Sequence, residues 1–354
     1  MTSLITRFML VLLPTVLLAG CNTVVMNPSG DIAAQQSHLI WVSTMLMLLI
    51  IVPVIILTFL FAWRYRKNNT AATYEPDWDH STQLELVIWG APLLIIIALG
   101  LITWISTHTL DPYRKLSRIS ENKPIPAGTK TLNVEVVALD WKWLFIYPDL
   151  GIATVNELAA PVDVPVHFKI TASTVMNSFF IPALAGQIYA MPGMETSLNA
   201  VINKAGEFDG FSANYSGAGF SDMRFKFHGL SAQDFDLWVQ KTKAQGSTLA
   251  RNDYLQLEKS SQRDPIRRYA AVDADLYHAI LNRCVADGEV CMDKMMMSNA
   301  SANANANAKA YAASGIKTSF TNMFAERVKQ DSTSRLALNT DADICSASPL
   351  TTGK

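Results

Sequence analysis

The sequence predicts a membrane-anchored α+β protein: a hairpin of two transmembrane helices, an extracytoplasmic β-sandwich and a helical C-terminal extension. Three observations lead to this prediction. Two long runs without a formal charge occupy residues 39–63 and 86–107. From about residue 130, apolar residues alternate with polar ones, which is the period of a strand that is buried on one face. From Ser231 the apolar spacing changes to that of an amphipathic helix.

Composition narrows the functions that the 354-residue chain can have. Half of the residues are hydrophobic, and the formal net charge of −1 gives no reason to expect a nucleic-acid partner. The cysteines form neither a CxxC pair nor a CxxCH motif, which argues against a zinc ribbon, a thioredoxin-type centre and covalently attached haem. The four cysteines are Cys21, Cys284, Cys291 and Cys345.

Residues 1–20 have the features of a secretory signal peptide. Arg7 precedes an apolar run over residues 8–18, which is too short for a stable transmembrane helix. The run ends in LLAGC, and small residues before a cysteine resemble the lipoprotein box of bacteria, in which the cysteine is acylated and becomes the new N-terminus. We therefore favour lipidation of Cys21 over an ordinary signal peptide with a chance cysteine.

Residues 21–110 are predicted to hold an N-terminal segment and the transmembrane hairpin. Each uncharged run exceeds the roughly 20 residues that cross a bilayer, and membrane helices tolerate prolines such as Pro53 and Pro92. Three basic residues follow the first span directly, namely Arg64, Arg66 and Lys67. Positive charge at that end places the connecting loop in the cytoplasm. The N-terminus and everything after residue 108 are therefore predicted to lie outside.

Glu85 lies at the cytoplasmic start of the second span, in the sequence LELVIWGAP. A carboxylate at this position often marks only the helix end, where it interacts favourably with the positive end of the helix dipole. The functional alternative is an entry point for protons into a partner subunit. The spacing alone favours the first interpretation.

Residues 111–129 are predicted to form a polar, proline-bearing linker, and residues 130–230 a sandwich or small barrel outside the membrane. The sequences TLNVEVV and VPVHFKI alternate in the manner of strands. Further short strands are predicted at residues 141–147, 177–181, 197–202, 207–215 and 223–228. Several short strands without intervening helical patterns favour a β-domain of about 100 residues.

Residues 231–297 are predicted to form a helical, aromatic-rich extension. Ser231 and Asp234 resemble a capping box at the start of its first helix. The apolar face of that helix consists of Phe235, Trp238 and Val239. A second helix is predicted after Pro265, with an apolar stripe that packs on the sandwich or on a partner. That stripe consists of Tyr269, Leu276, Tyr277 and Ile280. Residues 298–354 are of low complexity and are predicted to be disordered.

Cys284 and Cys291 are seven positions apart, which on an unbroken helix is about 10.5 Å and beyond the reach of a disulfide. A tight turn at Asp287 and Gly288 would bring the two together, and the oxidising environment outside the cytoplasm favours a disulfide. The alternative is capture of Cu(I) by soft sulfur ligands. Those ligands would be Cys291, Met292 and Met295 to Met297. We favour the disulfide.

Residues 215–226, YSGAGFSDMRFK, have the length and glycine content of a loop that wraps a metal between two strands. The loop contains no cysteine and no histidine, and its one carboxylate is Asp222. Asn177, some forty residues upstream, is its companion at the start of another predicted strand. The loop therefore has the shape of a metal site without the ligands.

The order of these elements resembles subunit II of the haem–copper respiratory oxidases over roughly residues 22–285, and the resemblance implies a cupredoxin-like fold for the β-sandwich. In members that oxidise cytochrome c, this domain holds a dinuclear copper centre, with a histidine before a strand and a loop of pattern CSExCGxxHxxM. The corresponding positions in this chain are Asn177, Tyr215, Gly217, Gly219, Met223 and Lys226. All six have lost the ligand chemistry, and a dinuclear site cannot form without its bridging thiolates. The resemblance thus implies a domain without metal.

MNSFFIP, GQIYAMPGM, SANYSGAGFS and VALDWKWLFIYP resemble the quinol-oxidising branch of this family, the cytochrome bo-type ubiquinol oxidases. The resemblance implies a non-redox subunit of a proton-pumping oxidase that oxidises ubiquinol and reduces oxygen to water. Haems and a copper are then expected in the partner, subunit I, and no cofactor in this chain. The expected surroundings are subunit I, further small membrane subunits and the lipid bilayer. Trp141 and Trp143 would serve packing, because large aromatic side chains dominate small sandwich cores.

The same resemblance changes the interpretation of Glu85. In this family a glutamate at the cytoplasmic start of the second helix of subunit II lies by the entrance of a proton channel in subunit I, so proton uptake becomes as well supported as a helix-end role. The resemblance also implies a multi-pass protein of the bacterial inner membrane with a periplasmic C-terminal domain. Two alternatives stay open: a membrane-anchored lipoprotein scaffold or copper-handling cupredoxin-like protein, and a cytochrome c oxidase subunit with an altered copper centre.

Overall fold

The computed structural model describes residues 23–73, 75 and 77–313. The chain divides into two compact units, residues 1–292 and 293–354. The predicted signal peptide, Cys21, Cys345 and the end of the predicted tail lie outside the described residues.

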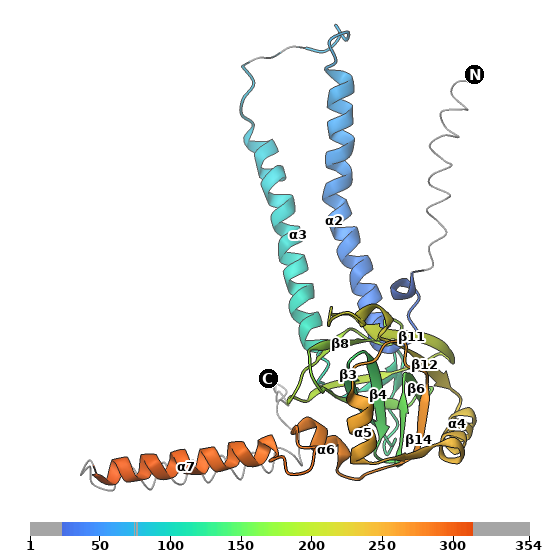
Figure 1. The fold of residues 1–354 in the computed structure, drawn as a ribbon. Helices are drawn as coiled ribbons and strands as arrows, with labels where there is room; N and C mark the ends of the chain where they lie inside the picture. The colour runs from blue at the N-terminus through green and yellow to red at the C-terminus, as the bar shows by residue number, and fades with distance from the viewer. Residues whose placement is uncertain (1–22, 74, 76, 314–354) are drawn as a thin grey trace, which may run out of the picture. The chain divides into compact units, whose positions relative to one another are not determined.

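Two long apolar helices form the predicted hairpin, and their lengths and compositions suit membrane spans. After a short 3-10 turn, η1 (Val24–Met26), come α2 (Asp31–Arg64) and α3 (Thr82–Thr109). The two helices run side by side (Figure 1). Both extend beyond the uncharged runs at each end, because flanking polar residues continue the helical hydrogen bonding. Pro53 and Pro92 lie inside the helices, as predicted.

The β-domain is a sandwich of two mixed sheets, as the sequence predicted. The larger sheet contains β3 (Leu132–Leu139), β4 (Lys142–Tyr147), β5 (Ile152–Val155), β7 (Pro165–Ala172), β10 (Thr196–Val201), β13 (Ser247–Leu249) and β14 (Arg267–Val272). Its order is β10-β7-β3-β4-β5-β14-β13. The smaller sheet contains β6 (Glu157–Pro161), β8 (Asn177–Phe180), β9 (Ile188–Ala190), β11 (Gly206–Ser212) and β12 (Arg224–Leu230). Its order is β6-β12-β11-β8-β9.

The inner core lies between the two sheets and is rich in aromatic rings. Phe179 is fully buried, and its ring centroid lies 5.4 Å from that of Trp143 and 5.5 Å from that of Phe225. Alternate residues of β3, such as Val134 and Val136, face this core. The strict alternation in the sequence is therefore the direct cause of the inner layer.

A second, outer core covers the opposite face of the seven-stranded sheet. Val137, Leu139 and Leu144 contribute to it from β3 and β4. The C-terminal extension supplies its other half, through Leu249, Tyr254, Leu257, Tyr269, Leu276, Tyr277 and Ile280. The helices of the extension are α4 (Ala232–Gln245), α5 (Arg251–Glu258) and α6 (Leu276–Leu281). The extension therefore completes the β-domain rather than forming a separate layer of helices.

The predicted second helix of the extension is wrong in its first half. Residues 267–272 form β14, which pairs antiparallel with β5, and the helix α6 begins only at Leu276. Strand β5 has open backbone hydrogen-bonding groups on that side, and pairing satisfies them. The first helix agrees with the prediction: the Ser231 side chain accepts a hydrogen bond from the backbone N–H of Asp234, and Phe235 and Val239 are buried.

Two further segments differ from the predictions. The predicted linker contains a small antiparallel pair, β1 (Arg118–Ser120) and β2 (Lys123–Pro124). The predicted disorder from residue 298 is wrong for residues 298–313, which belong to the helix α7 (Met292–Ala313). Alanine recurs through this helix and has the highest intrinsic helix propensity, which explains the difference.

Candidate functional site

Asn177 begins β8 where the related copper proteins have a histidine ligand, and both ends of its side-chain amide are engaged. Its Oδ1 accepts a hydrogen bond from Oγ of Ser212 at 3.1 Å. Its Nδ2 donates to the carbonyl oxygen of Val175 at 3.2 Å. The side chain is only 1% exposed. Asn177 therefore holds β8 to the end of β11, which is a structural role.

Trp141 lies across the glycine loop of residues 215–226. Its indole Nε1 donates to the carbonyl oxygen of Ser216 at 3.3 Å. A Cβ atom at Gly219 would lie 2.5 Å from Cδ2 of the Trp141 ring, and one at Gly217 would lie 3.0 Å from Cζ2. Gly217 also has a φ of +121°, which side chains other than hydrogen rarely allow. The indole thus occupies the volume that side chains at these two positions would need.

The other loop positions divide between the interior and the solvent. Met223 is fully buried in the inner core. Tyr215 is 76% exposed, and its ring packs edge-on against Phe220 at a centroid distance of 5.7 Å. Met223 therefore fills space inside the sandwich, whereas Tyr215 lies outside it.

Lys226, the last of the six positions, does not fill the loop. It lies in β12 between the buried residues Phe225 and Phe227, so strand alternation directs its side chain outward. Its Nζ lies 2.8 Å from Oδ1 of Asp209 and 3.0 Å from Oε1 of Glu207. Hydrogen bonds to these two carboxylates raise the pKa of Lys226.

The donor set of the loop does not fit a dinuclear copper centre. Such a centre needs bridging thiolates and imidazoles, and the six positions offer one buried thioether, one engaged amide and no thiolate. The indole of Trp141 occupies the remaining space. The residues at these six positions therefore do not fit the copper centre of the copper-bearing relatives.

A polar cluster that the sequence gave no sign of fixes the C-terminal extension to the sheet. Lys142 is 1% exposed, and its Nζ donates to the carbonyl oxygen of Lys259 at 2.9 Å and to Oγ of Ser261 at 2.5 Å. Its charge faces the carboxylate of Asp264 at 3.3 Å, with 6% of that side chain exposed. Burial lowers the pKa of Lys142, although Asp264 opposes this effect. Nearby, Arg268 of β14 forms two hydrogen bonds of 2.8 Å with Glu157.

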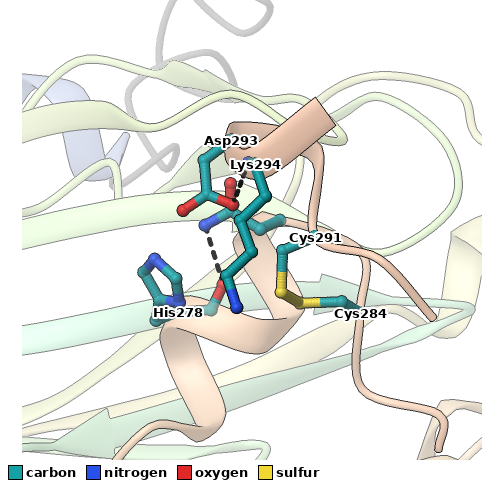
Figure 2. Close-up of a disulfide and its surroundings, with 6 residues drawn as sticks. His278, Cys284, Cys291, Asp293 and Lys294 are labelled. Atoms are coloured by element: carbon teal, nitrogen blue, oxygen red, sulfur yellow. Dashed lines mark hydrogen bonds between the residues drawn. A yellow bond between two sulfur atoms is a disulfide. The ribbon is translucent and has the colours of Figure 1, made fainter. Parts of the chain in front are cut away.

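The structure joins Cys284 to Cys291 in a disulfide, the alternative that we favoured (Figure 2). Helix α6 ends at Leu281, and Gly288 has a φ of +85°, so the chain turns between the two cysteines and brings their Cα atoms within 4.8 Å. Cys284 itself lies in the outer core. In this structure the Cys291 sulfur is thus not available as the thiolate ligand of the copper-capture alternative.

Glu85 lies in the first turn of α3 and has a partner that sequence reasoning missed. Its Oε1 lies 2.9 Å from Nδ1 of His80, and the other ring nitrogen of His80 lies 3.1 Å from Oγ1 of Thr82. Both His80 and Glu85 are more than half exposed, at 62% and 51% of their side chains. A histidine five residues before a helix-start glutamate was the available signal. The pair places an imidazole and a carboxylate together at the predicted cytoplasmic boundary.

Comparison with known protein families accounts for two parts of the β-domain. The profile of the family described as "Cytochrome C oxidase subunit II, periplasmic domain" matches residues 150–228. The profile described as "COX Aromatic Rich Motif" matches residues 243–288, which form most of the outer-core half of the extension. The membrane hairpin, the sandwich and these two profiles together define a class, the subunit II proteins of haem–copper oxidases.

Comparison with curated relatives identifies the family within this class. The cytochrome bo(3) ubiquinol oxidase subunit 2 of Pseudomonas putida is 50% identical over 267 residues, covering 75% of this chain and 82% of the relative. That of Pseudomonas aeruginosa is 49% identical over 278 residues, covering 78% of this chain and 81% of the relative. The ubiquinol oxidase subunit 2 of Acetobacter aceti is 48% identical over 265 residues, covering 75% of this chain and 84% of the relative. The chain belongs to the ubiquinol oxidase subunit 2 family.

Proposed function

We propose that the protein is the non-redox subunit II of a proton-pumping terminal ubiquinol oxidase. The observation that carries the proposal is the glycine loop, in which Trp141 occupies the place of the copper ligands and no thiolate is present. Electrons from ubiquinol then enter the complex through subunit I, whose haems and copper reduce oxygen to water. This chain stabilises subunit I with its helix hairpin and covers it on the periplasmic side.

Isolation of the complex from bacterial inner membranes in mild detergent tests this proposal. The chain is expected to co-elute with haem-bearing subunits that oxidise ubiquinol, and the chain itself is expected to contribute no copper. A chain that elutes alone would reject the proposal in favour of the lipoprotein scaffold. About two coppers per copy of this chain, above the copper of subunit I, would overturn the non-redox assignment. Nothing in the described residues favours either alternative.

Glu85 is the proposed point at which protons approach subunit I. Its hydrogen bond to His80 supports this role, because an imidazole can both donate and accept a proton and lies within hydrogen-bonding distance of the carboxylate. Glu85→Ala is expected to slow ubiquinol oxidation several-fold in the assembled oxidase, and Glu85→Asp to retain more activity. Glu75→Ala, in the same loop region, is the matched control. Unchanged oxygen consumption and proton pumping in Glu85→Ala would contradict the role.

Lipidation of Cys21 is part of the same proposal. A cleaved signal peptide and an acylated cysteine would add a second anchor on the outer side of the membrane, where two hydrophobic attachments hold far better than one. Mass spectrometry of the mature protein is expected to find an N-terminal, acylated Cys21, and Cys21→Ser to abolish the added mass. An unmodified N-terminus at another residue would reject this part.

A further inference from the structure

A continuous crevice lies where α2 begins and α3 ends. Two cavities form it, of about 260 and 440 Å³. They share five lining residues: Asp31, Gln35, Thr109, Leu110 and Arg118. The smaller cavity opens toward the β-domain, through Leu198 and Asn199 of β10, and the larger one extends down the groove between the two helices. The crevice thus connects the β-domain to the membrane-spanning segments.

The upper part of the crevice contains a guanidinium group that is held in place by a buried carboxylate. Asp31 is 5% exposed, and its Oδ2 accepts hydrogen bonds from Nε of Arg118 at 3.0 Å and from Nε2 of Gln35 at 2.8 Å. Arg118 uses Nε in this pair, its guanidinium carries two further donor nitrogens, and the residue lines both cavities. Arginine held in this way is suited to a phosphate group, because its planar fork donates two parallel hydrogen bonds.

The lower part of the crevice is apolar and lies within the spans. Leu39 and Val42 of α2 face Ile102 and Ile105 of α3 across it. Val42 is eleven residues beyond Asp31, which is about 16 Å along a helix. In the predicted membrane span this depth corresponds to the hydrocarbon layer, where the groove offers a wall for an acyl chain.

The charges that line the crevice balance. Arg114, Lys115 and Arg118 oppose Asp31, Asp111 and Glu121. Glu121 and Arg118 line the larger cavity together. Such a set suits a headgroup that carries one phosphate and one ammonium group better than a headgroup with net negative charge.

We propose that this crevice binds a glycerophospholipid with a zwitterionic, amine-bearing headgroup. Arg118 holds the phosphate, Glu121 faces the ammonium group, and one acyl chain lies between α2 and α3. The lipid fills the gap beneath the β-domain and fixes the spacing of the two helices. Binding is non-covalent and leaves the lipid unchanged. The proposal does not depend on oxidase turnover.

The test compares assembled complexes that carry Val42→Trp, Val54→Trp or Arg118→Gln with the wild type. Val42→Trp fills the apolar groove without touching any charge, and Val54→Trp is the same change on α2 away from the cavity lining. After delipidation in detergent, native mass spectrometry is expected to find a retained phosphatidylethanolamine in the wild type and in Val54→Trp. The same lipid is expected to be lost from Val42→Trp and depleted in Arg118→Gln. Added phosphatidylethanolamine should raise the Tm of the delipidated wild type by a few degrees and leave the Tm of Val42→Trp unchanged.

Two results would overturn the proposal. Equal lipid retention in Val42→Trp and Val54→Trp would show that the crevice holds no lipid, for instance because a side chain of a partner subunit occupies it. Equal or greater stabilisation by phosphatidylglycerol than by phosphatidylethanolamine would reject the zwitterionic headgroup. Because Val42→Trp leaves the Asp31–Arg118 pair intact, misfolding of Arg118→Gln would not remove the test.

Discussion

The two faces of the seven-stranded sheet are closed in different ways. The inner face packs against the second sheet through fully buried aromatic rings, with Phe179 among Trp143, Phe168 and Phe225. The outer face packs against the C-terminal extension, and here apolar contacts are combined with a buried Lys142–Asp264 pair and a disulfide. Both cores thus bury many apolar side chains, and the outer core adds a buried ion pair and a disulfide.

This difference shows what the extension needs in order to stay bound. The extension covers the sheet with short helices and two strands at its edge, and the ion pair and the disulfide add individual links to their apolar burial. The outer core should therefore be sensitive to loss of its ion pair or its disulfide, whereas the inner core should respond most to a change in aromatic volume. Four substitutions test this expectation, from the largest effect to the smallest.

Phe179→Ala should give the largest loss, because it opens a cavity among four aromatic neighbours. The expected decrease in the free energy of unfolding is about 4 kcal/mol. Denaturant unfolding of the detergent-solubilised chain, followed by tryptophan fluorescence, measures it. Phe179→Leu, which keeps most of the volume, is the control and should lose clearly less. A loss below that of the outer-face variants would contradict the ranking.

Lys142→Met should be the most damaging change on the outer face. It removes the buried cation beside Asp264, which keeps only the half-exposed Arg267 as an ion-pair partner, and it leaves the carbonyl oxygen of Lys259 without this donor. Removal of one partner of a buried pair costs about 3 kcal/mol. We expect unfolding at lower denaturant and faster proteolysis of residues 259–266. Lys226→Met, which removes an exposed ion pair, is the matched control and should have little effect.

The double variant Cys284→Ser/Cys291→Ser should lower stability by about 2 kcal/mol, because the disulfide closes a short loop and restricts the unfolded chain. Thermal unfolding with and without reductant measures this effect. The wild type in reductant should match the double variant, and the variant itself should not respond to reductant. Identical Tm values for the oxidised wild type and the variant would show that the bridge does not stabilise the outer core.

Glu135→Gln should have the smallest effect. Unlike the other substitutions, it should raise the stability of the protein above neutral pH rather than lower it. Burial raises the pKa of Glu135 from 4.5 to about 7; Lys169 opposes this shift, and Glu195 and Asp149 add to it. Since the unfolded chain releases this proton at lower pH than the folded chain, stability falls as pH rises from about 4.5 to about 7. The variant should be about 1 kcal/mol more stable at pH 8, after allowance for partial exposure, with no difference at pH 4. Equal pH profiles of Tm for the variant and the wild type would contradict the raised pKa of Glu135.

The sequence predicted the inner half of the molecule because its elements follow simple periods. The uncharged runs identify α2 and α3, and alternation identifies β3 and β7. The strand β14 was missed because residues 267–272 have no strict alternation of apolar and polar residues. Their strand conformation depends on pairing with the free edge of β5. The Lys142–Asp264 pair was also out of reach, since the two residues are far apart in sequence and meet only after the extension has folded back.

The sequence indicated which residues form the glycine loop, but it did not indicate how their side chains pack. The resemblance marked Gly217 and Gly219 as positions without ligands, and it gave no means of seeing that Trp141 lies against both. It also treated Lys226 as part of the loop, whereas strand alternation directs this side chain to solvent. Ring positions and strand phase depend on tertiary packing, which a linear motif does not contain.

The contact between Trp141 and Gly219 makes the present state of the loop hard to reverse. A cysteine placed at position 219 would meet the base of the indole ring at 2.5 Å, close to the stem of the side chain, where rotation of the ring offers little relief. An engineer who restored every metal-binding residue at the six positions would therefore still lack a site until Trp141 moved or was replaced.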